Sequence, residues 1–368
     1  MSTRKIPELR IGDLVAKVPI IQGGMSVGIS LSGLASAVSK EGGIGVIGAA
    51  GIGMLEPDFK RNFREANKRA LRKELRAAKK ATDGIIGVNI MVALSDFDDL
   101  VMVAIEEDAD IIFMGAGLPL KPPKGLTKTQ IKDLHIKFVP IVSSAKAADL
   151  IIKYWVKSHD RIPDAIVVEG PKAGGHLGFK REQIDDPNYQ LEVIFPEVLE
   201  TVAKHERELG VRIPVIAAGG IYTGGDIYRF IKMGASGVQM GTRFVATYEC
   251  DASDLFKEAY IRCKKEDIVI IQSPVGLPGR AIRNEFLDDV ERGMKKPFIC
   301  PWKCLKTCNY KESPYCIALA LTNAKKGKLS DGYAFIGANG YRVDKIVHVS
   351  ELIEELIREY EEEAAKDS

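Results

Sequence analysis

Eight short apolar segments follow one another between residues 19 and 245 of the 368-residue chain, and they constrain its fold more than any other feature. None of them alternates apolar and polar residues, which is typical of strands buried on both faces of a parallel sheet. Their ranges are 19–24, 43–50, 85–91, 111–117, 138–144, 165–170, 214–220 and 237–245.

Helical stretches with apolar residues three and four positions apart separate most of these segments. That spacing is typical of helices that bury one face. The stretch 118–137 differs, because its three prolines predict a loop before a short helix. The predicted helices cover residues 31–42, 96–108, 145–158, 195–209 and 224–234.

Strand and helix units repeated in this way predict an α/β fold, a (β/α)8 TIM barrel over residues 1–265. An open doubly wound sheet usually places its glycine-rich turn after the first strand, whereas many strands end in glycine here. We expect residues 266–368 to form a C-terminal appendage that covers the barrel mouth. Its parts are an irregular stretch 272–284, a cysteine cluster, a small-residue stretch 331–342 and a terminal helix from Ser350.

The charges of the chain nearly balance, with 52 Lys and Arg against 50 Asp and Glu. A net charge of +2 gives no general attraction to nucleic acid or to an anionic membrane, so neither is an expected partner. The first 21 residues contain scattered charges and lack the apolar core of a signal peptide. No apolar run approaches the ~20 residues of a membrane-spanning helix. We therefore expect a cytoplasmic protein.

Glycines end the last two predicted strands, at Gly219–Gly220 and at Gly241, which Thr242 follows. Glycine leaves the neighbouring backbone N–H groups uncovered, and each turn leads into a predicted helix whose N-terminus favours an anion. The loops after strands seven and eight are the usual phosphate site of a TIM barrel. These turns together predict a phosphate-bearing ligand, although either one alone also fits a simple tight turn.

The end of the first predicted strand and the middle of the third carry residues suited to a flat ring. Gly23 and Gly24 allow a ring to lie against the main chain, and Met25 offers it a polarizable surface. Asn89 is a polar residue inside an otherwise apolar strand, where an unpaired amide is costly. Its amide suits the edge of a heterocycle, and capping of the backbone is the alternative interpretation.

The segment EGPKAGGHLG, residues 169–178, is the candidate for catalysis. Glu169 ends the sixth predicted strand, which places its carboxylate at the rim of the barrel. His176 follows on a glycine-flanked loop, and histidine takes and gives protons near neutral pH. The loop from 171 to 194 is long enough for a lid or binding loop. We therefore expect His176 to be catalytic.

Six motifs along the chain resemble the FMN-dependent nitronate monooxygenases, formerly called 2-nitropropane dioxygenases. They also resemble a close relative of that family, the flavin-dependent enoyl-acyl-carrier-protein reductase. The resemblance covers roughly residues 15–285. The motifs, in order, are QGGM, GGIGVIG, GVNIM, EGPKAGGHLG, IPVIAAGGI and GASGVQMGTRFV.

This resemblance implies an FMN-dependent oxidoreductase that converts nitronates and O2 to a carbonyl compound and nitrite. The alternative that it implies is an NAD(P)H-dependent enoyl-acyl-carrier-protein reductase with the same FMN site. It also implies that His176 is the active-site histidine and that Ser144 takes the place of a small polar residue. The implied cofactor-binding residues are Gly23, Gly24, Met25, Asn89, Glu169, Gly175, Ala218, Gly219, Gly220, Gln239, Gly241 and Thr242.

Four of the six cysteines, Cys300, Cys304, Cys308 and Cys316, lie close together in the sequence. Four thiols can bind zinc or an iron–sulfur cluster. The three-residue gaps between the first three of these cysteines differ from the paired spacing usual for structural zinc sites. A local disulfide and redox-active thiols near the barrel mouth are the other interpretations, so the presence of a metal stays open here.

Two charged segments each allow two interpretations. Residues 58–80 contain ten Lys or Arg and three acidic residues, which fits a solvated helix face or a docking surface for an acidic partner such as acyl carrier protein. The terminal segment is amphipathic with an acidic end. It predicts a helix that packs on its own barrel or on the partner subunit of a homodimer.

Overall fold

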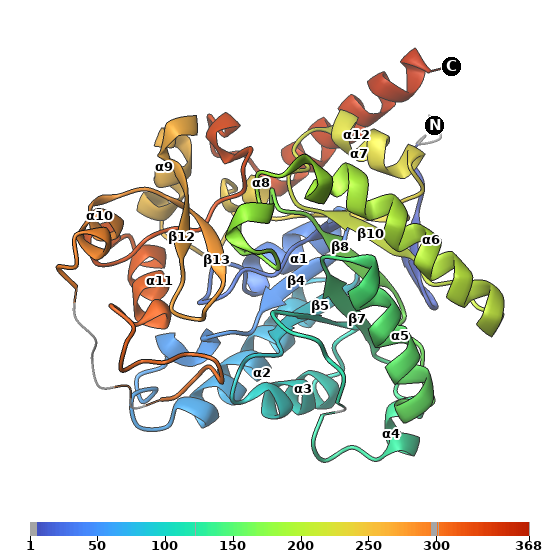
Figure 1. The fold of residues 1–368 in the computed structure, drawn as a ribbon, viewed down its shortest axis with the longest axis horizontal. Coiled ribbons are helices and arrows are strands. Elements are labelled where there is room, and N and C mark those ends of the chain that lie inside the picture. Colours follow the sequence, from blue (N-terminus) through green and yellow to red (C-terminus); the bar gives the residue numbers. More distant parts are fainter. Residues whose placement is uncertain (1–5, 122, 296–299, 301, 368) are drawn as a thin grey trace.

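The computed structural model describes residues 6–121, 123–295, 300 and 302–367, and its centre is a barrel of eight parallel strands (Figure 1). The strands run in the order β3-β11-β10-β8-β7-β6-β5-β4, and a parallel bridge between Ile21 and Ile44 joins the first to the last. The predicted (β/α)8 barrel is confirmed. Its strands are β3 (Ile20–Gln22), β4 (Gly45–Gly48), β5 (Ile86–Met91), β6 (Ile111–Gly115), β7 (Lys137–Val142), β8 (Ile166–Glu169), β10 (Val215–Ala218) and β11 (Gly237–Met240).

Helices between the strands form the outer layer of the barrel (Figure 1). One begins earlier than predicted, because α6 starts at Leu191 although Pro196 lies inside it. Leu191 and Ile194 extend its buried face ahead of the proline, so packing outweighs the lost backbone hydrogen bond. The helices are α1 (Ser32–Lys40), η1 (Ile52–Leu55), α2 (Phe63–Ala81), α3 (Phe97–Glu106), α4 (Lys128–Asp133), α5 (Ala145–His159), η2 (Arg181–Gln183), η3 (Pro187–Tyr189), α6 (Leu191–Leu209), α7 (Gly224–Lys232) and α8 (Thr242–Val245).

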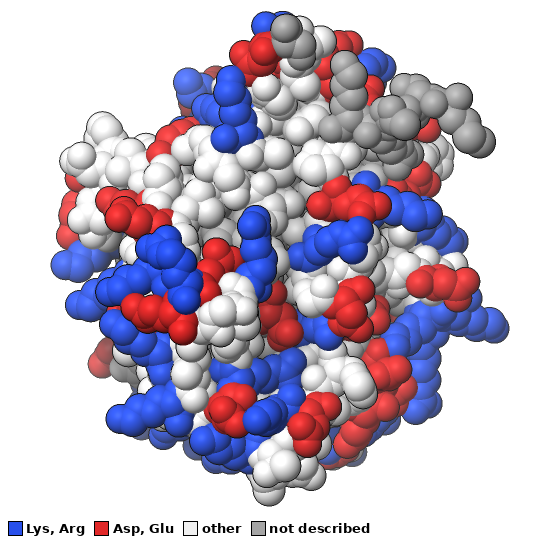
Figure 2. Space-filling model, turned by 90° about the vertical axis from the view of Figure 1, so that its right-hand side faces the viewer, with Lys and Arg blue, Asp and Glu red and all other residues white. Residues whose placement is uncertain are grey.

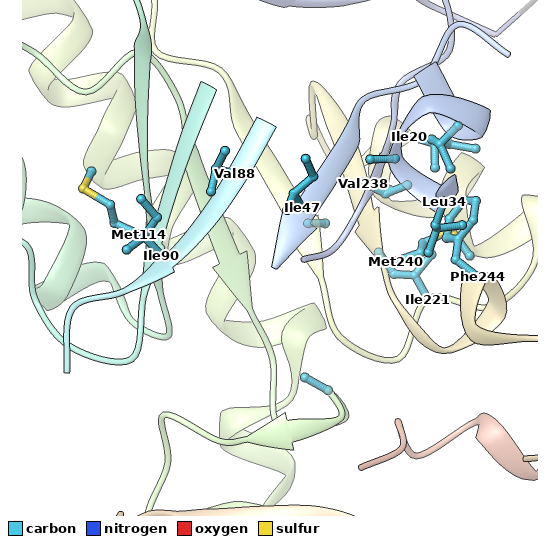
Figure 3. Packing of buried hydrophobic residues seen from close by; sticks show 14 of the residues in the cluster. Ile20, Leu34, Ile47, Val88, Ile90, Met114, Ile221, Val238, Met240 and Phe244 are labelled. Carbon is cyan, nitrogen blue, oxygen red and sulfur yellow. The ribbon is translucent and has the colours of Figure 1, made fainter. Parts of the chain in front are cut away.

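Successive residues of each barrel strand point to opposite sides, and both sides are apolar. In β4, Val46 belongs to the cluster that fills the barrel interior, whereas Ile47 belongs to the cluster between strands and helices. Figure 3 shows part of the second cluster, with Leu34 of α1 and Phe244 of α8 among the residues that pack there. Burial on both sides explains why the strand segments do not alternate.

A hairpin closes the barrel at the amino ends of its strands. It consists of β1 (Leu9–Ile11) and β2 (Leu14–Ala16), and its Leu9 and Ile11 are buried in the interior cluster. Asp13 in its turn forms an ion pair with Lys137, the first residue of β7. The carboxyl ends of the strands are therefore the end left for a ligand.

The C-terminal region adds a second sheet and returns to the barrel. In the order β12-β13-β9, this sheet joins the C-terminal region to a two-residue strand in the loop between β8 and α6. The prediction of an irregular stretch at 272–284 was wrong, because Pro278–Ile282 form a strand that pairs on both edges. The elements are β9 (Gly175–His176), α9 (Asp254–Arg262), η4 (Lys265–Asp267), β12 (Ile268–Gln272), β13 (Pro278–Ile282), α10 (Glu285–Glu291), α11 (Ile317–Lys325), η5 (Leu329–Asp331), η6 (Gly340–Arg342) and α12 (Val349–Lys366).

The terminal helix α12 packs on its own barrel, the first of the two arrangements predicted for it. The Gly224 N–H at the start of α7 donates a 2.7 Å hydrogen bond to Glu359 Oε2 of α12. A Cβ on Gly224 would lie 2.1 Å from the backbone oxygen of Leu356, so the two helices are in backbone contact. Only glycine allows this approach.

Figure 2 shows one face of the molecule, on which Lys and Arg side chains are interspersed with Asp and Glu side chains. Within the described part of the chain, we find no helix whose length and hydrophobicity would let it span a bilayer.

A substitution at Gly45 tests the close packing of β4 on α1. A Cβ there would lie 1.8 Å from the backbone oxygen of Ala35, so Gly45→Ala should destabilise the fold by about 3 kcal/mol through overpacking. Gly225→Ala is the control, since its nearest neighbour would lie at an ordinary 3.7 Å. Urea denaturation measures the free energy of unfolding of both variants. Equal stability of the two variants would contradict this packing.

Candidate active site

A cavity of about 320 Å³ opens at the carboxyl ends of the barrel strands. This is the end at which TIM-barrel enzymes place their active sites. The structure brings His176 and every predicted cofactor-binding residue to the wall of this one cavity. Ser144 is not among the lining residues, and its hydroxyl instead accepts a hydrogen bond from the Ala147 N–H at the start of α5.

The turn after β3 forms one side of the cavity. The Gly23 N–H donates to the Met240 carbonyl at 2.8 Å, which ties this turn to β11. A Cβ on Gly24 would lie 2.3 Å from the Cβ of Asn89, so only glycine lets Asn89 occupy its place. Met25 follows and also lines the cavity.

Two amide side chains on the cavity wall have polar atoms without hydrogen-bond partners among the described residues. Gln239 Oε1 is buried and accepts no hydrogen bond from any described residue. The Asn89 amide likewise forms no hydrogen bond with the described part of the chain. Because an unpaired buried acceptor is costly, Gln239 Oε1 indicates a ligand that donates a hydrogen bond, and the half-buried Asn89 amide offers that ligand a second polar contact.

The glycine turns after β10 and β11 expose backbone donors to the cavity. Gly219 and Gly220 have φ values of +93° and +87°, which favour glycine. The N–H groups of Gly219, Gly220, Gly241 and Thr242 have no acceptor among the residues that the structure describes. A Cβ on Gly241 would meet only Met25 Sδ, at 3.9 Å, so open space adjoins this turn. Several unpaired N–H groups around open space are an arrangement suited to binding an anion.

The N-terminus of α7, in contrast, is already occupied by the chain's own carboxylates. Asp226 accepts hydrogen bonds from the N–H groups of Tyr222 and Thr223, each at 3.0 Å, and Glu359 accepts one from Gly224. The N–H groups of this helix N-terminus, which we expected to bind a phosphate, are therefore already paired within the protein. Among the described residues, the backbone donors left for a ligand at this end of the cavity include those of the glycine turns.

Lys172 is a cavity residue that the sequence analysis missed. Its side chain runs along Gly220, where an added Cβ would lie 2.8 Å from the Cβ of Lys172. It forms no ion pair within the described part of the chain. An unpaired ammonium beside an anion site adds to the attraction for a phosphate. Its position in EGPKAGGHLG, three residues after Glu169, was the available signal.

His176 is held in place by the C-terminal region. Its Nε2 lies 2.8 Å from Ser273 Oγ, and its ring packs edge-on against Phe335 with a centroid distance of 5.1 Å. Burial lowers the pKa of His176 to about 4, so the ring is neutral at pH 7. Burial raises the pKa of Glu169 to about 7. The cavity therefore holds a neutral imidazole and a carboxyl group that is partly protonated near neutral pH.

Arg280 of β13 fixes the loop that carries these residues. Its guanidinium is buried and donates to the carbonyl oxygens of Pro171, at 2.7 Å, and Ala173, at 3.2 Å. Neither Arg280 nor Ser273 could be found from the sequence, because both act through side-chain hydrogen bonds to segments about 100 residues away.

Residues 335–340 form part of the cavity's cover. The Gly337 N–H donates to Thr242 Oγ1 at 3.0 Å, and Asn339 Nδ2 donates to the Gly220 carbonyl at 2.6 Å. The Ala338 N–H donates to the Lys172 carbonyl at 3.0 Å. The small-residue stretch of the C-terminal region thus covers the barrel mouth and is tied to the glycine turns.

The pKa of His176 predicts how stability depends on pH. Between pH 6.5 and about 4, the unfolded chain protonates this histidine and the folded chain does not, so the free energy of unfolding falls as the pH falls. His176→Gln should remove up to about 3 kcal/mol of that loss, measured by urea denaturation from pH 7 to pH 4. Replacement of the exposed His135 by Gln is the control. A pH profile unchanged in His176→Gln would contradict the burial of its ring.

Comparisons of this chain with known proteins agree on one protein family. A model of the nitronate monooxygenase family matches residues 9–359. A probable nitronate monooxygenase of Staphylococcus aureus is 30% identical over 306 residues, which cover 76% of this chain and 79% of that protein. The solved structure of FabK from Thermotoga maritima has a TM-score of 0.71 and 30% identity, and the alignment covers 95% of this chain and 94% of that one.

A further relative comes from Mycobacterium tuberculosis. It is the (3aS,4S,5R,7aS)-5-hydroxy-7a-methyl-1-oxo-octahydro-1H-indene-4-carboxyl-CoA dehydrogenase, 28% identical over 277 residues. The match covers 75% of this chain and 66% of that protein, just under two thirds of its length.

Proposed function

Because the chain belongs to the nitronate monooxygenase family of FMN-dependent oxidoreductases, we propose that it binds FMN in the barrel cavity and oxidises nitronates with O2 to a carbonyl compound and nitrite. The observation that carries this proposal is the pairing, in one cavity, of unsatisfied backbone donors with a fixed neutral histidine. The first feature suits a phosphate, and the second provides a fixed ring nitrogen that can donate a hydrogen bond to a substrate oxygen.

The residues present fit FMN. The free N–H groups of Gly219, Gly220, Gly241 and Thr242, with Lys172 beside them, would hold its phosphate. Gln239 and Asn89 would bond to the polar atoms of the cofactor, and the turn from Gly23 to Met25 would lie against its ring. When bound, FMN supplies the redox chemistry of its isoalloxazine ring.

His176 would bind and orient the substrate. Its low pKa makes it a weak base at pH 7, so it is better suited to a nitronate, which has already lost its proton, than to a neutral nitroalkane. With Nε2 beside Ser273, the ring can offer Nδ1 to an oxygen of the nitronate. Partial protonation of Glu169 reduces its repulsion of an anion.

Apolar side chains would keep the reaction away from water. Phe63, Leu94, Ile141, Ile317 and Leu321 line the same cavity and come from both the barrel and the C-terminal region. An apolar wall strengthens the hydrogen bonds inside it and limits side reactions with solvent.

An NAD(P)H-dependent enoyl-acyl-carrier-protein reductase is the second candidate. It is favoured by the 30% identity to FabK over 95% of this chain. Docking of acyl carrier protein on α2 has less support, because Arg72 and Arg76 of that helix form ion pairs with Glu106 and Glu107. Lys79 is likewise paired with Asp108. Such pairing leaves less positive charge for an acidic partner.

Substitution at Gly241 tests where the phosphate lies. Its φ of −118° suits any residue, and its Cβ would enter open space, so Gly241→Leu should fold normally while its side chain fills the cavity. Overpacking costs about 1–3 kcal/mol, so the FMN affinity should fall by about 10- to 100-fold. Flavin fluorescence titration measures this affinity. Gly241→Ala adds only a Cβ, so its FMN affinity should lie between those of the wild type and of Gly241→Leu. Wild-type affinity in Gly241→Leu would place the phosphate elsewhere.

Anaerobic stopped-flow mixing separates the two functions. The FMN-loaded protein should lose its flavin absorbance quickly with a nitronate and remain oxidised with NADPH. In His176→Ala, FMN should stay bound while the rate with nitronate falls by ~10² or more, as expected when a positioned polar group is lost. His135→Ala should react as the wild type does. Rapid bleaching by NADPH, with no reaction with the nitronate, would favour the reductase.

A further inference from the structure

The His176 ring has one hydrogen-bond partner within the described part of the chain. Its Nε2 lies 2.8 Å from Ser273 Oγ, whereas its Nδ1 has no partner there. A neutral imidazole carries one proton, on either nitrogen, and the nitrogen without the proton can only accept a hydrogen bond. The position of that proton therefore decides whether His176 offers a donor or an acceptor to a ligand in the cavity.

Ser273 is fixed by the turn that joins β12 to β13. Its N–H donates to the Leu277 carbonyl at 3.0 Å, and its carbonyl accepts from the Gly276 N–H at 2.9 Å. The residue is only 3% exposed, and its Oγ accepts a hydrogen bond from the Val275 N–H at 3.3 Å. The turn thus holds a buried hydroxyl against the imidazole and already uses one acceptor position of that hydroxyl.

The donors and acceptors at Ser273 distinguish the two possible positions of the ring proton. A hydroxyl donates one hydrogen bond and accepts two. If the hydroxyl donates to His176 Nε2 and accepts from the Val275 N–H, its own proton is paired. If Nε2 carries the ring proton instead, the hydroxyl accepts two hydrogen bonds, and its own proton has no other acceptor among the described residues. Because an unpaired buried donor is costly, the first arrangement is the more stable one.

Packing holds the ring in the orientation that makes this bond. The ring lies edge-on against Phe335, with the centroids 5.1 Å apart. The next residue, Leu177, donates its N–H to the Pro278 carbonyl of β13 at 2.9 Å. Rotation of the ring by half a turn would place a carbon atom beside the Ser273 hydroxyl, which would then lose its acceptor. Nε2 is therefore the nitrogen that contacts Ser273.

We propose that Ser273 is a positioning residue for His176, because its hydroxyl donates a hydrogen bond to Nε2 and so keeps the ring proton on Nδ1. The ring then has no free lone pair. It can donate from Nδ1 to an oxygen atom of a substrate, but it cannot remove a proton from carbon. Within the function proposed above, on which this consequence rests, His176 binds a nitronate oxygen and leaves a neutral nitroalkane unactivated.

Nitrogen NMR of the full-length protein tests the position of the proton without any reaction. In protein whose histidine rings carry nitrogen-15, studied at about pH 8, the chemical shift distinguishes a protonated ring nitrogen from an unprotonated one. Couplings to the ring C–H protons distinguish Nδ1 from Nε2, and the signals of His176 are those missing from the spectrum of His176→Gln. We expect a proton on Nδ1 and none on Nε2. A proton on Nε2 would overturn the proposal, whether or not the protein oxidises nitronates.

Substitutions at Ser273 test its part in holding the proton. Ser273→Ala removes the donor to Nε2, so the proton should be shared between both nitrogens. The rate of reaction of the FMN-loaded protein with a nitronate should then fall by about 10-fold, as expected when one hydrogen bond is lost. Ser273→Thr keeps a hydroxyl and should retain both the proton on Nδ1 and most of the rate.

Ser313→Ala is the matched control, because the buried Ser313 hydroxyl donates to the Asn309 carbonyl at 2.8 Å and has no contact with His176. This variant should keep the wild-type spectrum and rate. Circular dichroism checks that each variant is folded. A folded Ser273→Ala variant that keeps the proton wholly on Nδ1 would also overturn the proposal. A wild-type protein that does not react with nitronates would count against the proposed function alone, because the NMR result does not depend on turnover.

Discussion

The antiparallel pairing of β9 with β13 is the interaction on which the candidate site depends. Two residues of β9, Gly175 and His176, pair with Arg280 and Gly279 of β13. The same strand supplies the buried Arg280 side chain, which bonds to two carbonyl oxygens of the loop. Without these contacts, the long connection between β8 and α6 would have many conformations, and fixing one of them costs free energy for every residue. The C-terminal region therefore orders a loop of the barrel and covers the cavity.

The barrel itself could be predicted from the sequence, because a strand buried on both faces leaves a local pattern. Val46 and Ile47 face different clusters and are both apolar, so the run containing them does not alternate. The glycine turns were predictable for a similar reason, since the constraint at Gly219 and Gly220 lies in their own backbone. Parallel strands then bring these separate turns to the same end of the barrel.

Other parts of the site could not be predicted, because they arise from contacts between distant segments. Ser273 is an ordinary serine in the sequence, and its bond to His176 joins residues 97 positions apart. Arg280 lies in a stretch rich in proline and glycine, whose local composition predicts irregular structure although β13 pairs on both edges. The N-terminus of α7 had a predicted affinity for anions, yet Glu359 of α12 occupies it. In each case the deciding partner lies elsewhere in the chain.

Burial determines the chemistry of the cavity. It keeps His176 neutral and brings the pKa of Glu169 close to neutral pH, so neither group carries a fixed charge that would dominate the site. Lys172 and the free N–H groups of the glycine turns supply the positive potential at one end. With positive potential at one end and uncharged polar groups at the other, the cavity suits an anionic cofactor group at the first end and a small substrate near His176 at the second.

A crystal structure of the protein with FMN bound tests the central claim most directly. We expect electron density for the phosphate within hydrogen-bond distance of the Gly219–Gly220 and Gly241–Thr242 backbone, with the His176 ring facing the isoalloxazine. A phosphate bound outside these two turns, or an isoalloxazine ring on the far side of the cavity from His176, would contradict it.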